Sequence, residues 1–185
     1  MTAVKTASQT AVHPAAYPAA HPAAKSASRT QAVERSKPTK KDAIALLKAD
    51  HEAVNQLFDE FEKTHSVSNK KALVAEICTA LTVHAQIEEE IFYPAVKAAL
   101  KDKVLIPEAT VEHAGVKDLI AQLEGVSPDG EMYDAKVKVL SEYVKHHVKE
   151  EQTEMFAKAK AAAMDMVELG TRLAARKAAL LAQAV

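Results

Sequence analysis

The chain of 185 residues has an ordinary globular composition, with 48% hydrophobic and 26% charged residues. Aromatic residues make up 4%, Trp is missing and Gly is scarce, so helices are favoured over a β-sandwich or barrel. The formal net charge of −1 gives no global reason to expect nucleic acid or an anionic membrane as a partner. The single Cys78, the lack of an apolar run of about 20 residues and the lack of a secretory signal favour a cytoplasmic protein.

Residues 1–40 differ from the rest of the chain and are rich in Ala, Pro and Ser. The repeat HPAA, YPAA, HPAA spaces three prolines four residues apart, which blocks a helix. Few large apolar side chains are present to offset the entropy of ordering. We expect a disordered basic tail that acts as a solubilising leader. Weak binding to nucleic acid or membrane and an organellar transit peptide are the alternatives.

The first two predicted helices each carry histidine in an apolar stripe. A helix at about 40–64 follows Thr39 or Asp42 as its cap and has His51 in phase with apolar residues three and four positions apart. After the polar break SVSNKK, a second helix is predicted at about 69–100. Its stripe consists of Leu73, Ile77, Leu81, His84, Glu88, Ile91 and Ala95.

Three more helices follow. A short one is predicted from Pro107 to Gly125, with His113 in its stripe. The turn VSPDGE precedes a fourth helix that starts near Asp129. A last Ala-rich helix at about 164–182 holds no candidate ligand, and we expect it to dock on the other helices or to form a homo-oligomer contact. The stripe of the fourth helix consists of Tyr133, Val137, Leu140, Val144, His147 and Glu151.

The short links predict an all-α, up-down-up-down antiparallel four-helix bundle at 41–160, with an additional C-terminal helix at 161–185. At about 1.5 Å of rise per residue, the histidine in each of the four stripes reaches the same height along the bundle. Two glutamates follow two of these histidines by four residues, so they enter the same layer. The predicted metal site consists of His51, His84, Glu88, His113, His147 and Glu151.

This layer requires a cation. Two buried carboxylates would lose hydration and repel each other unless positive charge compensates them. Four imidazoles and two carboxylates suit two metal ions better than one. The mixed nitrogen and oxygen donors fit iron or manganese, with zinc as an alternative, because Cys78 lies nearly two turns before His84.

The motifs resemble those of the hemerythrin HHE cation-binding domain family. The resemblance covers about 42–159 and rests on KADHE, HAQIEEEIFYP, VEHAG and HHVKEEQTEMF. It implies two non-haem irons joined by an oxo or hydroxo bridge, with His51 and His84 on one iron and His113 and His147 on the other. The bridging carboxylates implied by the resemblance are those of Glu88 and Glu151.

The sequence departs from the oxygen carriers of this family at one position. They have a further His one turn after the third-helix ligand, where this chain has Lys117. The resemblance therefore implies an open position on one iron for O2, NO, peroxide, water or hydroxide, or for another protein ligand. Tyr143, one turn before His147, is expected either to face the site or to be an ordinary buried Tyr. Glu89 and Glu150 are expected on a solvated face or as partners of imidazole N–H groups.

We therefore predict a di-iron protein that binds O2 or a related small ligand for sensing, scavenging or storage, in a stress-response context. A metal-dependent enzyme that detoxifies peroxide or NO would use the same site. A ferritin-like oxidase or storage bundle needs Glu-x-x-His on two helices, and the chain offers it once, at Glu62 and His65. A structural or interaction bundle without redox iron would leave Glu88 and Glu151 uncompensated.

Overall fold

The computed structural model describes residues 42–100, 104–128 and 130–184, and the predicted tail lies outside them. The chain divides into two units, Met1–Lys37 and Pro38–Val185, and all of the described residues belong to the second. Every regular element in the described part is helical, which confirms the all-α class. The elements are α1 (Ala43–Lys63), α2 (Val67–Ile87), η1 (Glu88–Phe92), α3 (Tyr93–Leu100), α4 (Leu105–Leu123), α5 (Glu131–Glu150), η2 (Glu151–Met155), α6 (Phe156–Ala161) and α7 (Met166–Gln183).

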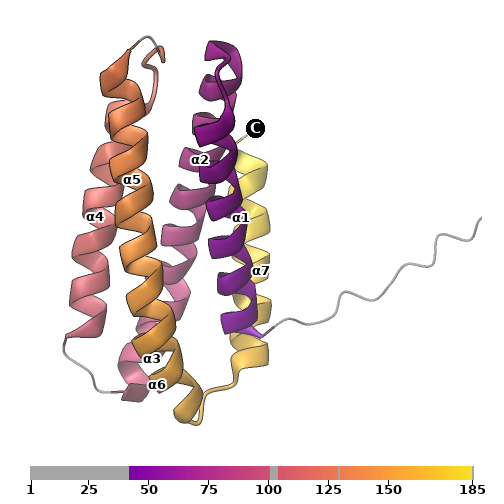
Figure 1. The fold of residues 1–185 in the computed structure, drawn as a ribbon. Coiled ribbons are helices and arrows are strands. Elements are labelled where there is room, and N and C mark those ends of the chain that lie inside the picture. Colours follow the sequence, from indigo (N-terminus) through magenta and orange to yellow (C-terminus); the bar gives the residue numbers. More distant parts are fainter. Residues whose placement is uncertain (1–41, 101–103, 129, 185) are drawn as a thin grey trace, which may run out of the picture. The chain divides into compact units, whose positions relative to one another are not determined.

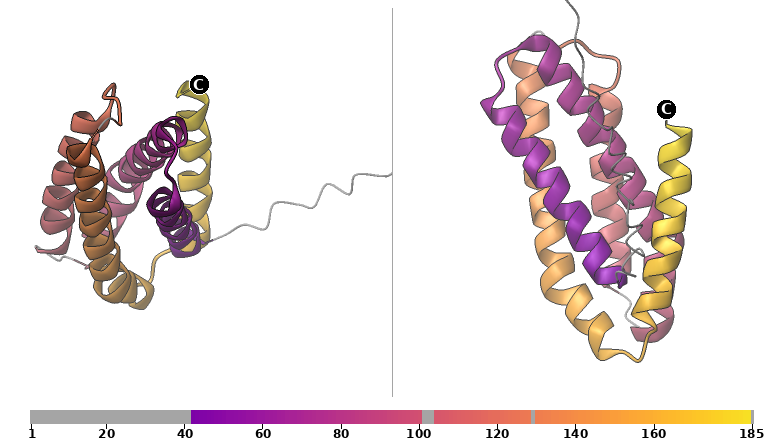
Figure 2. Two further views of the ribbon diagram at one scale, coloured as in Figure 1. Left: turned by 45° about the horizontal axis from the view of Figure 1, so that its top comes forward. Right: turned by 90° about the vertical axis from the view of Figure 1, so that its right-hand side faces the viewer.

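The long helices α1, α2, α4 and α5 lie alongside one another and alternate in direction (Figure 1). α7 runs beside α1 and α2, as the second view of Figure 2 shows. Its buried side chains include Leu169, Leu173 and Leu180, so apolar burial holds it there. No helix in the described ranges is long and apolar enough to cross a membrane.

Local signals set the helix ends. The Asp42 side chain accepts a hydrogen bond from the Ala45 N–H at 2.7 Å, which confirms Asp42 as the cap of α1. Ser66 caps α2 in the same way through Asn69. After α4, Gly125 has a φ of 72°, a left-handed conformation that Gly adopts without steric cost.

Two short π-helical segments, η1 and η2, interrupt the helices that carry the His-x3-Glu motifs. Each begins at the motif glutamate, because the Tyr93 N–H donates to the Glu88 carbonyl and the Phe156 N–H to the Glu151 carbonyl. Pro94 follows η1 but no proline follows η2, so proline is not their common cause. π turns often occur at functional sites, and here both coincide with the predicted bridging residues.

The π turn corrects one part of the predicted stripe. A π turn holds one residue more than an α turn, so it rotates the following helix by about 100°. The expected inward residues Ile91 and Ala95 are only partly buried, whereas Phe92, Tyr93 and Val96 are buried. The prediction was wrong beyond Glu88 because it continued the α-helical period through η1.

A polar layer separates two apolar clusters of the core. One cluster includes Leu47 and Phe92, and the other includes Val54 and Leu140. His51 lies between Leu47 and Val54 on α1, at the boundary between the clusters. In the described part of the chain the buried polar residues are His51, His84, Glu88, His113, Ser141, His147 and Glu151.

Candidate metal centre

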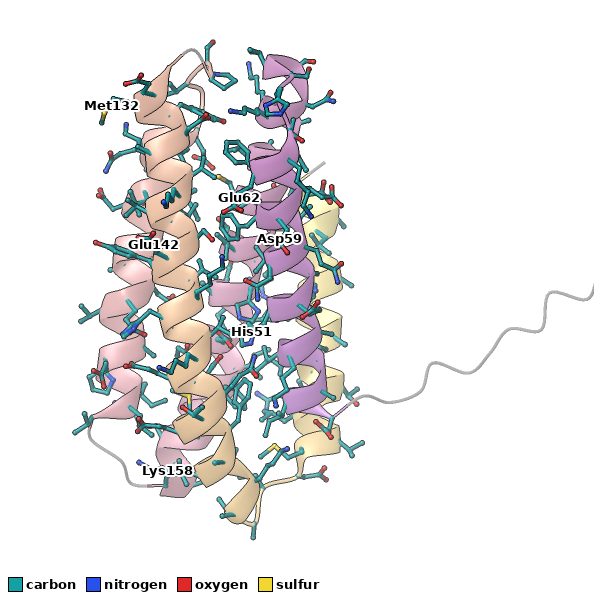
Figure 3. All side chains as sticks on the ribbon, viewed as in Figure 1. His51, Asp59, Glu62, Met132, Glu142 and Lys158 are labelled. Carbon is teal, nitrogen blue, oxygen red and sulfur yellow. The ribbon has the colours of Figure 1, made fainter. Side chains whose placement is uncertain are left out.

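The structure brings all six predicted ligands together. They come from α1, α2, η1, α4, α5 and η2, and none is more than 8% exposed. Figure 3 shows His51 on the inner side of α1, among side chains of the bundle interior. The ligand atoms of these six residues form two buried clusters, within each of which the atoms lie within 4.8 Å of one another: His51, His84, Glu88 and Glu151, which we call the first half, and Glu88, His113 and His147, the second half. Glu112, His146 and Glu150 form a third such cluster among the described residues, which is not buried.

In the first half, the Nε2 atoms of His51 and His84 are 2.9 Å apart. The His51 Nε2 lies 3.2 Å from Glu151 Oε2, and the His84 Nε2 lies 3.3 Å from Glu88 Oε1. Bonds of about 2.0–2.2 Å to one ion place its ligand atoms about 3–3.5 Å apart. The separations in the first half therefore match a shared cation.

The second half has the same spacing. The Nε2 atoms of His113 and His147 are 3.2 Å apart, and the His113 Nε2 lies 3.4 Å from Glu88 Oε2. Glu88 thus directs one oxygen to each half, as a bridging carboxylate would. Glu151 Oε2 lies against the first half.

The other nitrogen of each imidazole faces a polar side chain. A proton on Nδ1 donated in that direction leaves the Nε2 lone pair directed inward, which is the tautomer that binds a metal. At His51 this requires the oxygen of the neighbouring amide to face Nδ1, a half-turn of the amide group from the orientation found here. The Nδ1 contacts are His51 to Gln152 Nε2 at 3.1 Å, His84 to Asp50 Oδ2 at 3.6 Å, His113 to Glu89 Oε1 at 3.0 Å and His147 to Glu112 Oε2 at 2.7 Å.

Three of the four inward carboxylate oxygens lack hydrogen-bond partners among the described residues. Among the described residues, neither Glu88 Oε1 nor either carboxylate oxygen of Glu151 has a hydrogen-bond partner. Imidazole lone pairs that face each other at 2.9 and 3.2 Å also repel unless a cation or a proton lies between them. Buried carboxylates without partners are costly, so this donor set fits a pair of cations.

The directions of the pKa shifts at Glu88, His84 and His113 also fit a site that binds cations. Burial and the neighbouring carboxylate of Glu151 raise the pKa of Glu88 well above its usual value. Burial lowers the pKa of His84, and burial together with His147 lowers the pKa of His113 to about 4. Although burial acts to raise it, contacts with His51 lower the pKa of Glu151. Without a cation Glu88, His84 and His113 therefore favour their neutral forms, and a bound cation would favour the Glu88 carboxylate.

Comparison with known proteins agrees with this geometry. The family model of the hemerythrin HHE cation binding domain matches residues 42–159. The chain belongs to the hemerythrin HHE cation-binding domain family. The domain therefore binds metal cations, and the fold is a hemerythrin-like helical bundle.

Two individual proteins are similar to this HHE protein. The crystal structure of a hemerythrin HHE cation binding domain-containing protein from Mycobacterium kansasii superposes with a TM-score of 0.68. That match has 26% identity and covers 77% of this chain and 89% of that one. A DNA nickase from Nostoc sp. is 29% identical over 128 residues, which span 69% of this chain but only 35% of the nickase.

Tyr93 is a site residue that the sequence reasoning missed. It is buried, its hydroxyl donates to Glu88 Oε2 at 3.2 Å, and the same hydroxyl lies 3.3 Å from the His113 Nε2. Its ring also stacks on His113, with the centroids 5.5 Å apart. An aromatic residue five positions after the motif glutamate was the available signal, because a π turn places that position over the glutamate.

Lys117 lies outside the cation layer of this HHE domain. Its side chain is 46% exposed, and its Nζ lies 2.7 Å from both oxygens of Glu89. Although burial acts to raise it, contacts with Lys117 and His113 lower the pKa of Glu89 and keep it ionised. Lys117 thus orients Glu89, and the group beside the second half is the Tyr93 hydroxyl.

The three other residues considered for the site, Tyr143, Glu89 and Glu150, differ in where they lie. Both expectations for Tyr143 were wrong, because it is 51% exposed and its ring packs against Gly115. Glu89 faces the His113 Nδ1, which confirms the expectation that it is a partner of an imidazole N–H group. Glu150 instead contacts the exposed His146, at 3.2 Å.

Proposed function

We propose that this HHE-domain protein holds two iron ions and uses them to bind O2 or a related small ligand, NO or peroxide, for sensing, scavenging or storage. The observation that carries this proposal is the convergence of four imidazole Nε2 atoms on two buried carboxylates, three of whose four oxygens lack hydrogen-bond partners among the described residues. His51, His84 and Glu151 would hold one ion. His113 and His147 would hold the other, and Glu88 would bridge the two.

When bound, a pair of iron ions supplies electrons and an open coordination position for a small ligand. The protein's contribution is the fixed set of imidazoles and a site shielded from water. The Tyr93 hydroxyl adds a proton at the second half, beside Glu88 and His113.

A cavity of about 240 Å³ supports a small uncharged ligand. All four candidate histidines line it. Much of the rest of its wall is apolar, with Val54, Leu81, Val116 and Val144 among the lining residues. An apolar cavity admits O2 or NO without the desolvation cost that an ion would incur.

An enzyme that detoxifies peroxide or NO with the same metals is the second candidate. Tyr93 favours it, because a hydroxyl proton at the site suits the protonation of a reduced oxygen species. The distinction is kinetic: a carrier or sensor returns its ligand unchanged, whereas an enzyme consumes it over many turnovers.

Iron is proposed over manganese and zinc, although the same donors accept all of these metals and the supply in the cell decides between them. A cytoplasmic location and a homo-oligomer through α7 stay predictions. The proposed partner is a small molecule, with no specific nucleic acid and no membrane. The nickase is matched over 35% of its length, so its activity gives no reason to change this.

The test is metal analysis of the purified protein, followed by absorption spectroscopy of the anaerobic reduced form before and after exposure to O2 or NO. We expect about two irons per chain and near-ultraviolet charge-transfer bands that change with the ligand. Repeated additions of peroxide separate the candidates, because only an enzyme consumes each one. A colourless, iron-free and fully folded protein that takes up no iron would contradict the proposal.

A further inference from the structure

The C-terminal helix α7 makes ionic contacts with α1 and η1, two of the segments that carry the first half. It lies outside residues 42–159, the range matched by the family model. Lys177 Nζ lies 2.5 Å from Asp50 Oδ1, and Arg176 makes two contacts with Glu90, at 2.6 and 3.0 Å. These two ion pairs are neighbours on α7 but differ in what their carboxylates touch.

Lys177 contacts a carboxylate, that of Asp50, which itself faces the candidate ligand His84. The second oxygen of Asp50 faces the Nδ1 of His84 at 3.6 Å, so one carboxylate links α7 to the first half. Lys177 also lines the cavity onto which the four histidines open. Glu90 is exposed, and it accepts hydrogen bonds from Arg176 and Gln86, neither of which is a candidate ligand.

The equivalent carboxylate in the second half has a different partner. Glu112 lies 2.7 Å from the His147 Nδ1, and its other oxygen is 3.5 Å from the exposed His146. The Asp50 carboxylate instead has one oxygen fixed by Lys177 and the other facing His84.

We propose that Lys177 is a positioning residue for the metal centre, which fixes the Asp50 carboxylate so that it orients His84. The 3.6 Å separation is too long for a hydrogen bond. Such contacts often tighten when the functional complex forms. When His84 ligates a cation, its Nδ1–H becomes a stronger donor, and Asp50 accepts that proton from a fixed position.

This inference rests on the proposed function, because it requires a cation at His84. The test is the release of Fe²⁺ from the anaerobically loaded full chain to a chelator that becomes coloured on binding Fe²⁺. Partners behind a metal-bound histidine typically change metal affinity by about 10–100-fold, so we expect about a tenfold faster release of one of the two ions in Lys177→Gln. Lys177→Arg should restore slow release.

Arg176→Gln is the matched control, because it removes a neighbouring α7 ion pair that does not touch an imidazole partner. A double-mutant cycle with Asp50→Asn shows whether Lys177 acts through Asp50. If it does, adding Lys177→Gln to Asp50→Asn changes the release rate no further. Circular dichroism of each variant checks that α7 stays folded.

Equal release rates in Lys177→Gln, Arg176→Gln and the unchanged protein would overturn the inference, as would full additivity in the cycle. Either result leaves the proposed function intact, provided that the unchanged protein holds iron. Failure of the unchanged protein to bind iron would instead overturn the proposed function.

Discussion

The two halves of the metal centre are built from equivalent segments that differ in what lies behind their imidazoles. Each half takes its two histidines from two successive helices, and the second helix of each pair carries a His-x3-Glu motif followed by a π turn and an aromatic residue. Equivalent positions even make equivalent contacts: Asp50 faces His84 as Glu112 faces His147. The two halves are thus related as repeats, and their differences stand out.

The groups that face the imidazole Nδ1 atoms carry more negative charge in the second half than in the first. Carboxylates of Glu89 and Glu112 lie at 3.0 and 2.7 Å from its imidazoles, and the Tyr93 hydroxyl lies beside them. In the first half the corresponding groups are the neutral amide of Gln152, Asp50 at 3.6 Å, and Phe156, which stacks on His51.

The largest effect is expected from the residue that both halves share. Glu88 has one carboxylate oxygen in each half, and Glu88→Gln removes the negative charge that these oxygens share. Both ions should therefore be lost. Metal analysis after dialysis measures this. Glu90→Gln, two residues away on the exposed side, is the control and should retain both ions. Retention of two ions by Glu88→Gln would contradict the proposal that Glu88 bridges them.

Glu112→Gln should lower the metal affinity of the second half alone. It keeps the size of the side chain but removes the charge that accepts the His147 Nδ1 proton, and outer partners of this kind change metal affinity by about 10–100-fold. Competition with a chelator should show one weakened ion and one unchanged ion. Gln152→Glu makes the reverse change in the first half and should tighten the other ion. Equal loss of both ions would contradict independent tuning of the halves.

Acidification should release the metals because protons compete for the ligands. Glu88 has a raised pKa in the metal-free fold, so it binds a proton first as the pH falls, and His113 follows near its pKa of about 4. Both groups bind protons only when the cation is absent, so metal affinity falls as pH falls and rises as pH rises. Metal titrations from pH 4 to pH 8 measure the slope. An affinity independent of pH would contradict these assignments.

Tyr93→Phe should make the second half resemble the first, where a Phe ring, that of Phe156, stacks on the histidine. The substitution removes the hydroxyl near Glu88 and His113 but keeps the ring stacked on His113. We expect both ions to stay bound while the absorption spectrum of the oxidised form shifts. Phe156→Tyr is the reciprocal change, which introduces a hydroxyl into the first half. An unaltered spectrum in Tyr93→Phe would show that the hydroxyl does not interact with the centre.

His146→Ala is expected to have the smallest effect. His146 is adjacent to His147, but its side chain is 64% exposed, and it contacts Glu112 and Glu150 rather than a candidate ligand. Metal content and spectrum should stay unchanged within error, whereas His147→Ala should lose the second-half ion. A loss in His146→Ala similar to that in His147→Ala would mean that the inward face of α5 is assigned wrongly.

The α-helical period was sufficient to predict which six side chains share the buried polar layer. From each motif histidine to the glutamate four residues later the helix is regular, so sequence spacing gives the shared face. Tyr93 was missed because the π turn begins at Glu88 and rotates everything after it. Tyr143 was expected at the site from its position one turn before His147, but it lies at the edge of the buried stripe and is exposed.

The groups behind the imidazoles depend on packing between helices. Asp50 and Glu112 each precede a ligand in the sequence, yet each serves an imidazole on the neighbouring helix. Spacing along one helix does not reveal which neighbour packs against it. The same holds for α7, whose periodicity gave no sign that Lys177 reaches Asp50.

The most direct test of the metal centre is a crystal structure of the iron-loaded protein, with anomalous scattering recorded on both sides of the iron absorption edge. The account predicts two iron peaks per chain, one bonded to the Nε2 atoms of His51 and His84 and one to those of His113 and His147, with Glu88 bonded to both. A single peak, no peak, or iron bound away from these residues would contradict it.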